Sequence, residues 1–203
     1  MPNIPLSSTG AEGNVMPIVV PPRATLDDLY RTEGKAELIG GRIVHLMATG
    51  HAPNIIAGNI YVSLREYAKK PRKGVAYTES MGFAVRELPS GRESFCPDAA
   101  YYVGPIPANR MRFVMGAPTL AVEVRSESGY TAAAEEERAV KRRDYFQAGT
   151  LVIWDVDPQQ ECINFYRQSD PDQKTTHRRG ETAEADPATP GWRIAVDEVF
   201  QVS

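Results

Sequence analysis

The sequence predicts a mixed central β-sheet flanked by helices, in a single domain of the α+β or α/β kind. Its β-prone segments are grouped around two long helical segments instead of alternating strictly with them. No glycine-rich phosphate loop follows a predicted strand, which argues against a doubly wound nucleotide-binding fold. The chain has 203 residues, enough for one domain, which we place at residues 24–203.

The first elements are predicted from turn and capping residues. Residues 1–23 are rich in Pro, Ser and Gly without periodicity, so we expect a flexible N-terminal arm. Thr25 is a typical N-cap for a short helix, which we expect Gly34 to end. Between residues 36 and 47 two β-prone runs flank Gly40-Gly41, a pair that favours a tight hairpin turn.

The middle of the chain predicts one amphipathic helix and then four strands. Apolar residues recur at helical spacing from His51 to Lys70, and Pro71 is expected to stop the helix. Strands are expected at 75–79, 82–87, 95–103 and 119–125, with a Pro-rich connection at 104–118.

The last third begins with a second helix, at residues 131–148. Glutamates lie early in it, basic residues late, and Gly149 stands in the C-cap position. A strand at 151–156 follows and turns at Asp157-Pro158. Further strands are expected at 162–167, 174–178 and 192–196, with an acidic, Pro-rich loop at 180–191.

Composition limits the classes of function. A formal net charge of −3 argues against coating nucleic acid through bulk electrostatics, so DNA contact would depend on local basic clusters at 65–73, 138–143 or 177–179. No apolar run reaches the roughly 20 residues that span a bilayer. Without a secretory pattern at the N-terminus we expect a cytoplasmic protein, in which Cys96 and Cys162 are reduced core thiols.

Two acidic residues interrupt apolar strand segments. Asp98 is expected to share a strand face with Cys96 and Ala100, and Glu123 lies within the apolar strand at 119–125. On neighbouring strands, carboxylates ~4 Å apart would repel by about 4 kcal/mol at an effective dielectric near 20. Protonation, a basic partner or a divalent cation could offset this. A cation offers the most chemistry, because carboxylate oxygens select Mg²⁺ or Mn²⁺, which activate water at a phosphate.

Lys141 is a candidate third member of this site. On a helical wheel it shares a stripe with Ala134, Arg138, Tyr145 and Ala148. If the stripe packs toward the strand that carries Glu123, the ammonium reaches the carboxylate pair. The alternative is a surface pair between Lys141 and Glu137, four residues apart.

An ordered set of motifs resembles the Uma-two family, a branch of the PD-(D/E)XK phosphodiesterase superfamily whose members are described as restriction endonucleases. The similarity extends over most of residues 24–203. The residues that carry it are Glu37-Leu38-Ile39-Gly40-Gly41, His51, Pro97-Asp98, Ala121-Val122-Glu123-Val124, Lys141 with Tyr145, Gly149, Trp154-Asp155 and Val196-Asp197-Glu198-Val199-Phe200.

The resemblance implies a restriction-endonuclease-like sheet with a divalent metal, normally Mg²⁺. Asp98 and Glu123 would hold the ion, with the backbone carbonyl of Val124 as a further ligand. Lys141 would replace the lysine that many superfamily members keep two residues after the strand glutamate, and Glu37 would be an added acid.

We assign His51, Arg125 and Tyr145 to substrate binding. His51 would lie on a helix beside the same cleft. Arg125 occupies the position of the usual superfamily lysine, where a guanidinium can stabilise a phosphorane but is a poor base.

Three functions follow as hypotheses. The first is hydrolysis of DNA phosphodiester bonds, by a protein expected to form a homodimer if it breaks both strands. The second is a nuclease-like fold without catalysis, acting as a DNA-binding or mobile-element accessory protein. The third takes His45, His51 and Glu37 as a non-haem iron or zinc site, although His45 lies in a predicted strand and His51 at a helix start.

Overall fold

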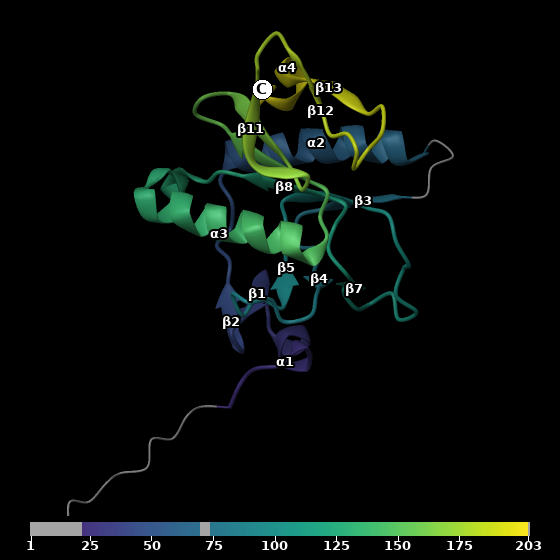
Figure 1. Cartoon of the computed structure of the whole chain (residues 1–203), viewed down its shortest axis with the longest axis vertical. Coiled ribbons are helices and arrows are strands. Elements are labelled where there is room, and N and C mark those ends of the chain that lie inside the picture. The colour runs from purple at the N-terminus through teal and green to yellow at the C-terminus, as the bar shows by residue number, and fades with distance from the viewer. Residues whose placement is uncertain (1–21, 70–73, 203) are drawn as a thin grey trace, which may run out of the picture.

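The computed structural model describes residues 22–69 and 74–202, and its centre is a six-stranded mixed sheet (Figure 1). Only β8 and β9 run parallel within this sheet, and α3 supplies the crossover that a parallel pair requires. The predicted mixed sheet flanked by helices is confirmed. The order across the sheet is β11 (Asp170–Arg178), β10 (Cys162–Arg167), β9 (Val152–Asp157), β8 (Leu120–Val124), β6 (Ala99–Tyr102) and β3 (Val75–Thr78).

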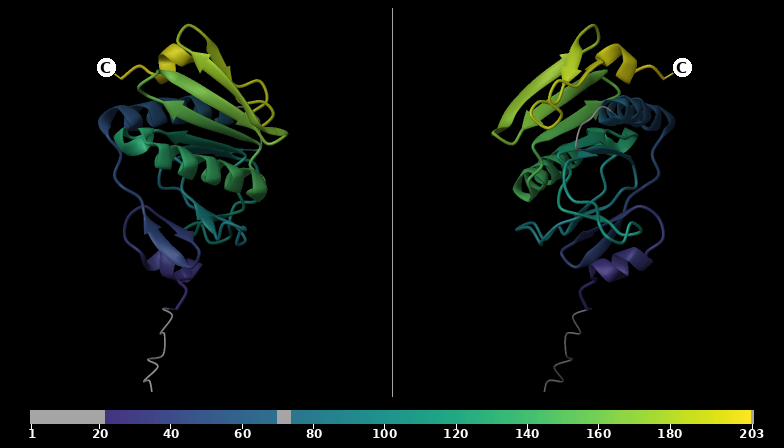
Figure 2. Two further views of the ribbon diagram at one scale, coloured as in Figure 1. Left: turned by 60° about the vertical axis from the view of Figure 1, so that its left-hand side comes forward. Right: turned by 90° about the vertical axis from the view of Figure 1, so that its right-hand side faces the viewer.

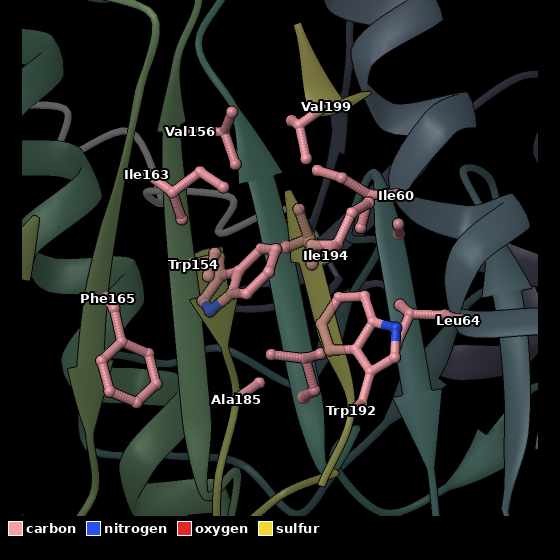
Figure 3. Close-up of a cluster of buried hydrophobic side chains, with 14 of the residues drawn as sticks. Ile60, Leu64, Trp154, Val156, Ile163, Phe165, Ala185, Trp192, Ile194 and Val199 are labelled. Atoms are coloured by element: carbon pink, nitrogen blue, oxygen red, sulfur yellow. The ribbon is translucent and has the colours of Figure 1, made fainter. Parts of the chain in front are cut away.

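The two long helices lie on opposite faces of the sheet (Figures 1 and 2). The face of α2 (His51–Lys69) is also covered by β12 (Thr182–Glu184), β13 (Arg193–Ala195) and α4 (Val196–Val199). The larger apolar core lies here. Figure 3 shows its centre, where Trp154 from β9 stacks on Trp192 with 5.0 Å between ring centroids, beside Ile60 and Leu64 of α2.

A second core lies between the other face of the sheet and α3 (Ala132–Ala148). Tyr145 and Phe146 of α3 pack there with Phe83 and Phe95, which belong to a small sheet separate from the central one. That sheet comprises β5 (Ser94–Phe95), β4 (Phe83–Ala84) and β7 (Val114–Met115).

The N-terminal elements follow their local signals. Thr25 caps α1 (Leu26–Arg31) in a capping box with Asp28. The hairpin of β1 (Ala36–Ile39) and β2 (Arg42–His45) turns at Gly40 and Gly41, whose φ values of 60° and 68° suit glycine. The helix ends three residues before Gly34, because Thr32 is already extended.

The strand predicted at 95–103 is wrong as a continuous element. It divides into β5 and β6, and Asp98 lies in the bend between them instead of alternating with Cys96 and Ala100 on one strand face. Pro97 explains the break, because it has no N–H for a sheet ladder.

Other boundaries also differ from the predictions. Of residues 82–87 only Phe83–Ala84 is strand, the connection 104–118 contains β7, and the loop 180–191 contains β12. A 3₁₀ turn, η1 (Glu127–Tyr130), leads into α3. Strand β11 begins at Asp170, four residues before its predicted start, and Val196 starts α4 instead of ending a strand.

Some expectations concern the whole chain. Both Cys96 and Cys162 are free and buried, as predicted. Within residues 22–69 and 74–202, no helix combines the length and apolarity needed to cross a membrane. Residues 1–21 of the predicted N-terminal arm and Pro71, the expected helix stop, lie outside the described residues.

Candidate active site

Asp98 lies at the end of the central sheet where β6 begins and β8 ends. Its backbone N–H donates to Val122 at 3.0 Å, and its Oδ2 accepts the N–H of Val124 at 2.9 Å. The bend before β6 therefore turns the Asp98 carboxylate back onto β8. The N–H and C=O of a strand residue point in the same direction, so the Val124 carbonyl also projects toward Asp98.

The other Asp98 oxygen pairs with Lys35, a residue that sequence reasoning missed. Lys35 Nζ lies 2.9 Å from Asp98 Oδ1, and both side chains are largely buried. Burial alone would lower the pKa of Lys35, but the negative charge of Asp98 outweighs it and raises the pKa above its usual value. Lys35 directly precedes β1, and no residue pattern near it indicated a partner 63 positions away.

Glu123 projects from β8 toward α3. Its Oε1 accepts the Tyr145 hydroxyl at 2.6 Å and lies 2.9 Å from Lys141 Nζ. Burial raises the pKa of Glu123, and the negative charges of Asp98 and Glu37 add to that rise although Lys141 opposes it. Asp98 and Glu123 thus act on each other electrostatically, and burial disfavours the charged form of Glu123.

Lys141 joins two carboxylates from separate elements. Its Nζ lies 2.9 Å from Glu123 Oε1 and 3.0 Å from Glu37 Oε1. Burial would lower the pKa of Lys141, but the two carboxylates raise it well above its usual value, so the side chain stays protonated. The structure therefore favours the inward orientation of Lys141 over a surface pair with Glu137.

Glu37 is also bound by a buried arginine, Arg92. Arg92 donates Nη1 to Glu37 and its Nε to Asp144 Oδ2 at 2.9 Å, while the N–H of Cys96 donates to Glu37 Oε1 at 3.0 Å. Burial would raise the pKa of Glu37, but Lys141 and Arg92 hold it below its usual value. Arg92 and Asp144 were also missed; Asp144 follows Lys141 by three residues on α3, a spacing that could have indicated a shared helix face.

Arg125 and Tyr145, which we expected to bind substrate, are instead bound to other residues of the protein. The Arg125 guanidinium binds Asp155 through two hydrogen bonds, of 2.8 Å and 2.6 Å, and only 12% of its side chain is exposed. Tyr145 is fully buried and donates to Glu123. Both residues therefore act within the protein, Arg125 as an ion-pair partner and Tyr145 in positioning Glu123.

The histidines do not converge. His51 is the exposed first residue of α2, and His45 is exposed at the end of β2, whereas Glu37 is buried against Arg92. Among the described residues no three His, Cys, Asp or Glu side chains are arranged to hold a metal ion, so the predicted iron or zinc site is wrong. His177, in the predicted basic cluster at 177–179, is half-buried beside Phe165.

The two carboxylates open to different spaces. Glu123 lines a small cavity of about 30 Å³ under α3, together with Arg138, Lys141 and Arg142. Asp98 lines an open depression of about 380 Å³ beside α2. The larger opening beside these carboxylates is therefore on the Asp98 side.

Comparison with known proteins agrees with this architecture. The fold is similar to a crystal structure described as "a putative nuclease belonging to DUF820 from Anabaena variabilis ATCC 29413", with a TM-score of 0.65 and 18% identity over 88% of this chain and 98% of that chain. No curated protein matches the sequence. A family described as "Putative restriction endonuclease", Uma2, matches residues 23–197. The chain belongs to the Uma2 family, as its motifs predicted.

Proposed function

We propose that this protein is a metal-dependent endonuclease that hydrolyses DNA phosphodiester bonds at the cluster of Asp98, Glu123 and Lys141. Membership of a family described as restriction endonucleases supports nuclease activity. The observation that carries the proposal is the position of Lys141. Its ammonium lies about 3 Å from both Glu123 and Glu37, at the sheet end where Asp98 also lies.

The donor set fits a hard divalent cation. Asp98 and Glu123 offer carboxylate oxygens, and the Val124 carbonyl projects toward Asp98. Since the described residues contain no cluster of three ligating side chains, water would complete the shell, which matches the preference of Mg²⁺ for one or two carboxylates and several waters. Burial, with the neighbouring charges of Asp98 and Glu37, raises the pKa of Glu123, and a bound cation would offset this by favouring the charged carboxylate. Such an ion would polarise the phosphate and lower the pKa of a bound water.

The protein's own groups supply positioning and positive charge. Lys141 stays protonated between two carboxylates, so it acts as a hydrogen-bond donor that offsets charge developing on the phosphate, not as a base. Lys35, which lies beside Asp98, can also offset charge that develops on the phosphate. Tyr145 and the Arg92–Glu37 pair orient Glu123 and Lys141, because each makes a direct contact with one of them.

Cleavage of supercoiled plasmid tests the proposal. Glu123→Gln and Asp98→Asn should each lower the rate with Mg²⁺ or Mn²⁺ at least about 100-fold, as loss of a transition-state interaction of ~2.7 kcal/mol does. Glu136→Gln, an exposed position on the outer side of α3, is the matched control and should cut at the wild-type rate. Wild-type cutting by Glu123→Gln would remove the assignment.

Metal titration separates this proposal from the non-catalytic alternative. Calorimetry should detect Mn²⁺ binding by the wild-type protein and much weaker binding by Asp98→Asn. DNA binding without any Mn²⁺ binding would favour a DNA-binding accessory protein instead. The homodimer and the cytoplasmic location stay predictions, and light scattering of the purified protein tests the first.

A further inference from the structure

A groove runs between α2 and the edge strand β3, away from Asp98. Two neighbouring depressions form it, of about 380 Å³ and about 340 Å³, and Tyr61 lines both. The first is lined by Asn54, Ala57, Gly58, Tyr61, Thr78, Glu79, Ser80 and Asp98; the second by Tyr61, Arg65, Ala68, Lys69, Gly74, Val75 and Ala76.

The direction of the groove follows from the sheet register. Thr78 of β3 pairs with Ala99, the residue after Asp98, whereas Val75 pairs with Tyr102 at the far end of β6. On the helix side Asn54, Gly58, Tyr61 and Arg65 recur at helical spacing on one face, over roughly 16 Å at 1.5 Å per residue. Figure 1 shows α2 passing beside β3. The groove therefore leads from the carboxylate cluster along the outside of the sheet.

Gly58 is the unusual residue of this wall. Glycine in the interior of a helix is destabilising relative to alanine, and close packing usually explains its presence. A Cβ added at Gly58 would meet no atom within 4 Å, so nothing inside the protein requires a glycine there. Its half-buried position on the groove wall is instead suited to the close approach of a ligand.

The charges along the groove change from acidic to basic with distance from Asp98. Asp98 and Glu79 line the near part, where Asn54 Nδ2 donates to Glu79 at 3.3 Å. Arg65 and Lys69 line the far part, where Lys69 Nζ is paired with Glu66 at 2.5 Å. Arg65 is exposed, and within the described parts of the chain its guanidinium makes a 3.5 Å hydrogen bond to the Tyr61 hydroxyl but no ion pair. A cation held only by a phenol is free to bind an external anion.

We propose that this groove binds the backbone of one DNA strand and leads it to the carboxylate cluster. The inference rests on the proposed nuclease function. Gly58 would let the sugar-phosphate chain approach α2, Tyr61 would pack against a sugar or base, and Arg65 would contact a phosphate. The acidic end holds the cluster where cleavage would occur, and the basic end holds the strand beyond it.

Equilibrium binding of a fluorescein-labelled oligonucleotide, single-stranded or duplex, tests the groove. The measurements use the Glu123→Gln protein without divalent metal, so that cleavage does not consume the probe. Arg65→Ala should weaken binding about five- to tenfold and lower the slope of log Kd against log salt by about one unit, as loss of one phosphate contact does. Arg143→Ala, an exposed arginine on α3, is the matched control and should leave both quantities unchanged.

Gly58 gives a test that separates binding from folding. Gly58→Ala should raise the melting temperature, because alanine favours the helix, yet weaken DNA binding because its methyl group enters the groove. Gly58→Glu should weaken binding further by adding a carboxylate.

Each outcome bears on one proposal only. The groove proposal would be overturned if Gly58→Glu and Arg65→Ala bound the oligonucleotide as tightly as the Glu123→Gln parent does, or if Arg143→Ala lost as much affinity as they do. It would also be overturned if the parent bound no oligonucleotide. Each of these results would count against the groove even if the wild type cleaves DNA. Loss of binding in the groove variants would support it, even if the wild type failed to cleave.

Discussion

Glu123 of β8 and Arg125, the residue that follows the end of this strand, lie two positions apart and both contact α3, yet their charges meet different surroundings. Arg125 is bound in a two-point contact by Asp155, with Asp157 3.7 Å away. Glu123 shares Lys141 with Glu37, and burial raises its pKa further. The arginine has several acidic partners, whereas Glu123 shares a single lysine with Glu37.

The two residues differ in how far the surrounding charges offset the burial of their own. Buried charges stabilise a fold only when they are fully paired, and Arg125 satisfies that condition. Both oxygens of Glu123 have partners too, in Lys141 and Tyr145, but these contacts do not offset its burial, so the fold tolerates a carboxylate whose pKa is raised. Such tolerance is typical of functional sites, where perturbed carboxylates gather. Their positions at the end of β8 alone would not distinguish the two residues.

The largest expected effect is that of Arg125→Met. It would leave the buried side chains of Asp155 and Asp157, which are 3% and 2% exposed, without their arginine, and should lower the free energy of unfolding by about 3–5 kcal/mol. Urea denaturation of the purified variant measures this. Arg143→Met on the exposed side of α3 is the control. If Arg125→Met lowered the free energy of unfolding no more than Arg143→Met does, the buried ion pairs of Arg125 would not stabilise the fold, and the contrast with Glu123 would be wrong.

Glu37→Gln and Glu123→Gln should differ in size and in pH dependence. Glu37→Gln should cost about 3 kcal/mol near neutral pH, because Arg92 and Lys141 each lose a buried partner. The pKa of Glu37 is lowered in the fold, so the wild-type advantage is present above the ordinary value of 4.5 and is lost as the pH falls below it.

Glu123→Gln should behave in the opposite way. The pKa of Glu123 is raised in the fold, so the folded state holds its proton more tightly than the unfolded chain, and ionisation costs stability as the pH rises above 4.5. The variant should therefore gain stability relative to wild type with rising pH. Urea titrations between pH 4 and 7 measure both variants, and parallel pH profiles would contradict the assignment.

Tyr145→Phe sharpens the comparison with the smallest change. It removes the hydroxyl that donates to Glu123 but keeps the ring stacked on Phe95, with 4.1 Å between centroids. The loss of one hydrogen bond to a charged group should cost about 1.5 kcal/mol, measured by thermal unfolding. Because that bond lowers the pKa of Glu123, the variant should also show a stronger pH dependence than wild type. An unchanged profile would argue that Tyr145 only fills space.

The elements were predictable wherever local chemistry decides them. Thr25, the Gly40-Gly41 pair and Gly149 each marked a boundary, because caps and turns depend on a few neighbouring residues. The stripe of α3 also made Lys141 a candidate member of the site, beside the alternative of a surface pair with Glu137.

The partners of these residues could not be predicted in the same way. Lys35 meets Asp98 across 63 residues, and Arg92 meets Glu37 across 55. Such pairs depend on how distant elements pack, which one sequence does not reveal. Likewise the alternation rule failed at Asp98, because the bend after Pro97 overrides the periodicity of a strand.

The stacked pair of Trp154 and Trp192 gives the protein an intrinsic fluorescent probe of its fold. The chain has two tryptophans, and both lie in the core beneath α2, where Trp192 donates to Ser63 of that helix. Their intrinsic fluorescence should therefore change when α2 and the β12–β13 hairpin separate from the sheet, and stay constant when only the carboxylate cluster on the sheet's end is altered. A variant that stops working while its emission spectrum is unchanged has lost its chemistry and kept its fold.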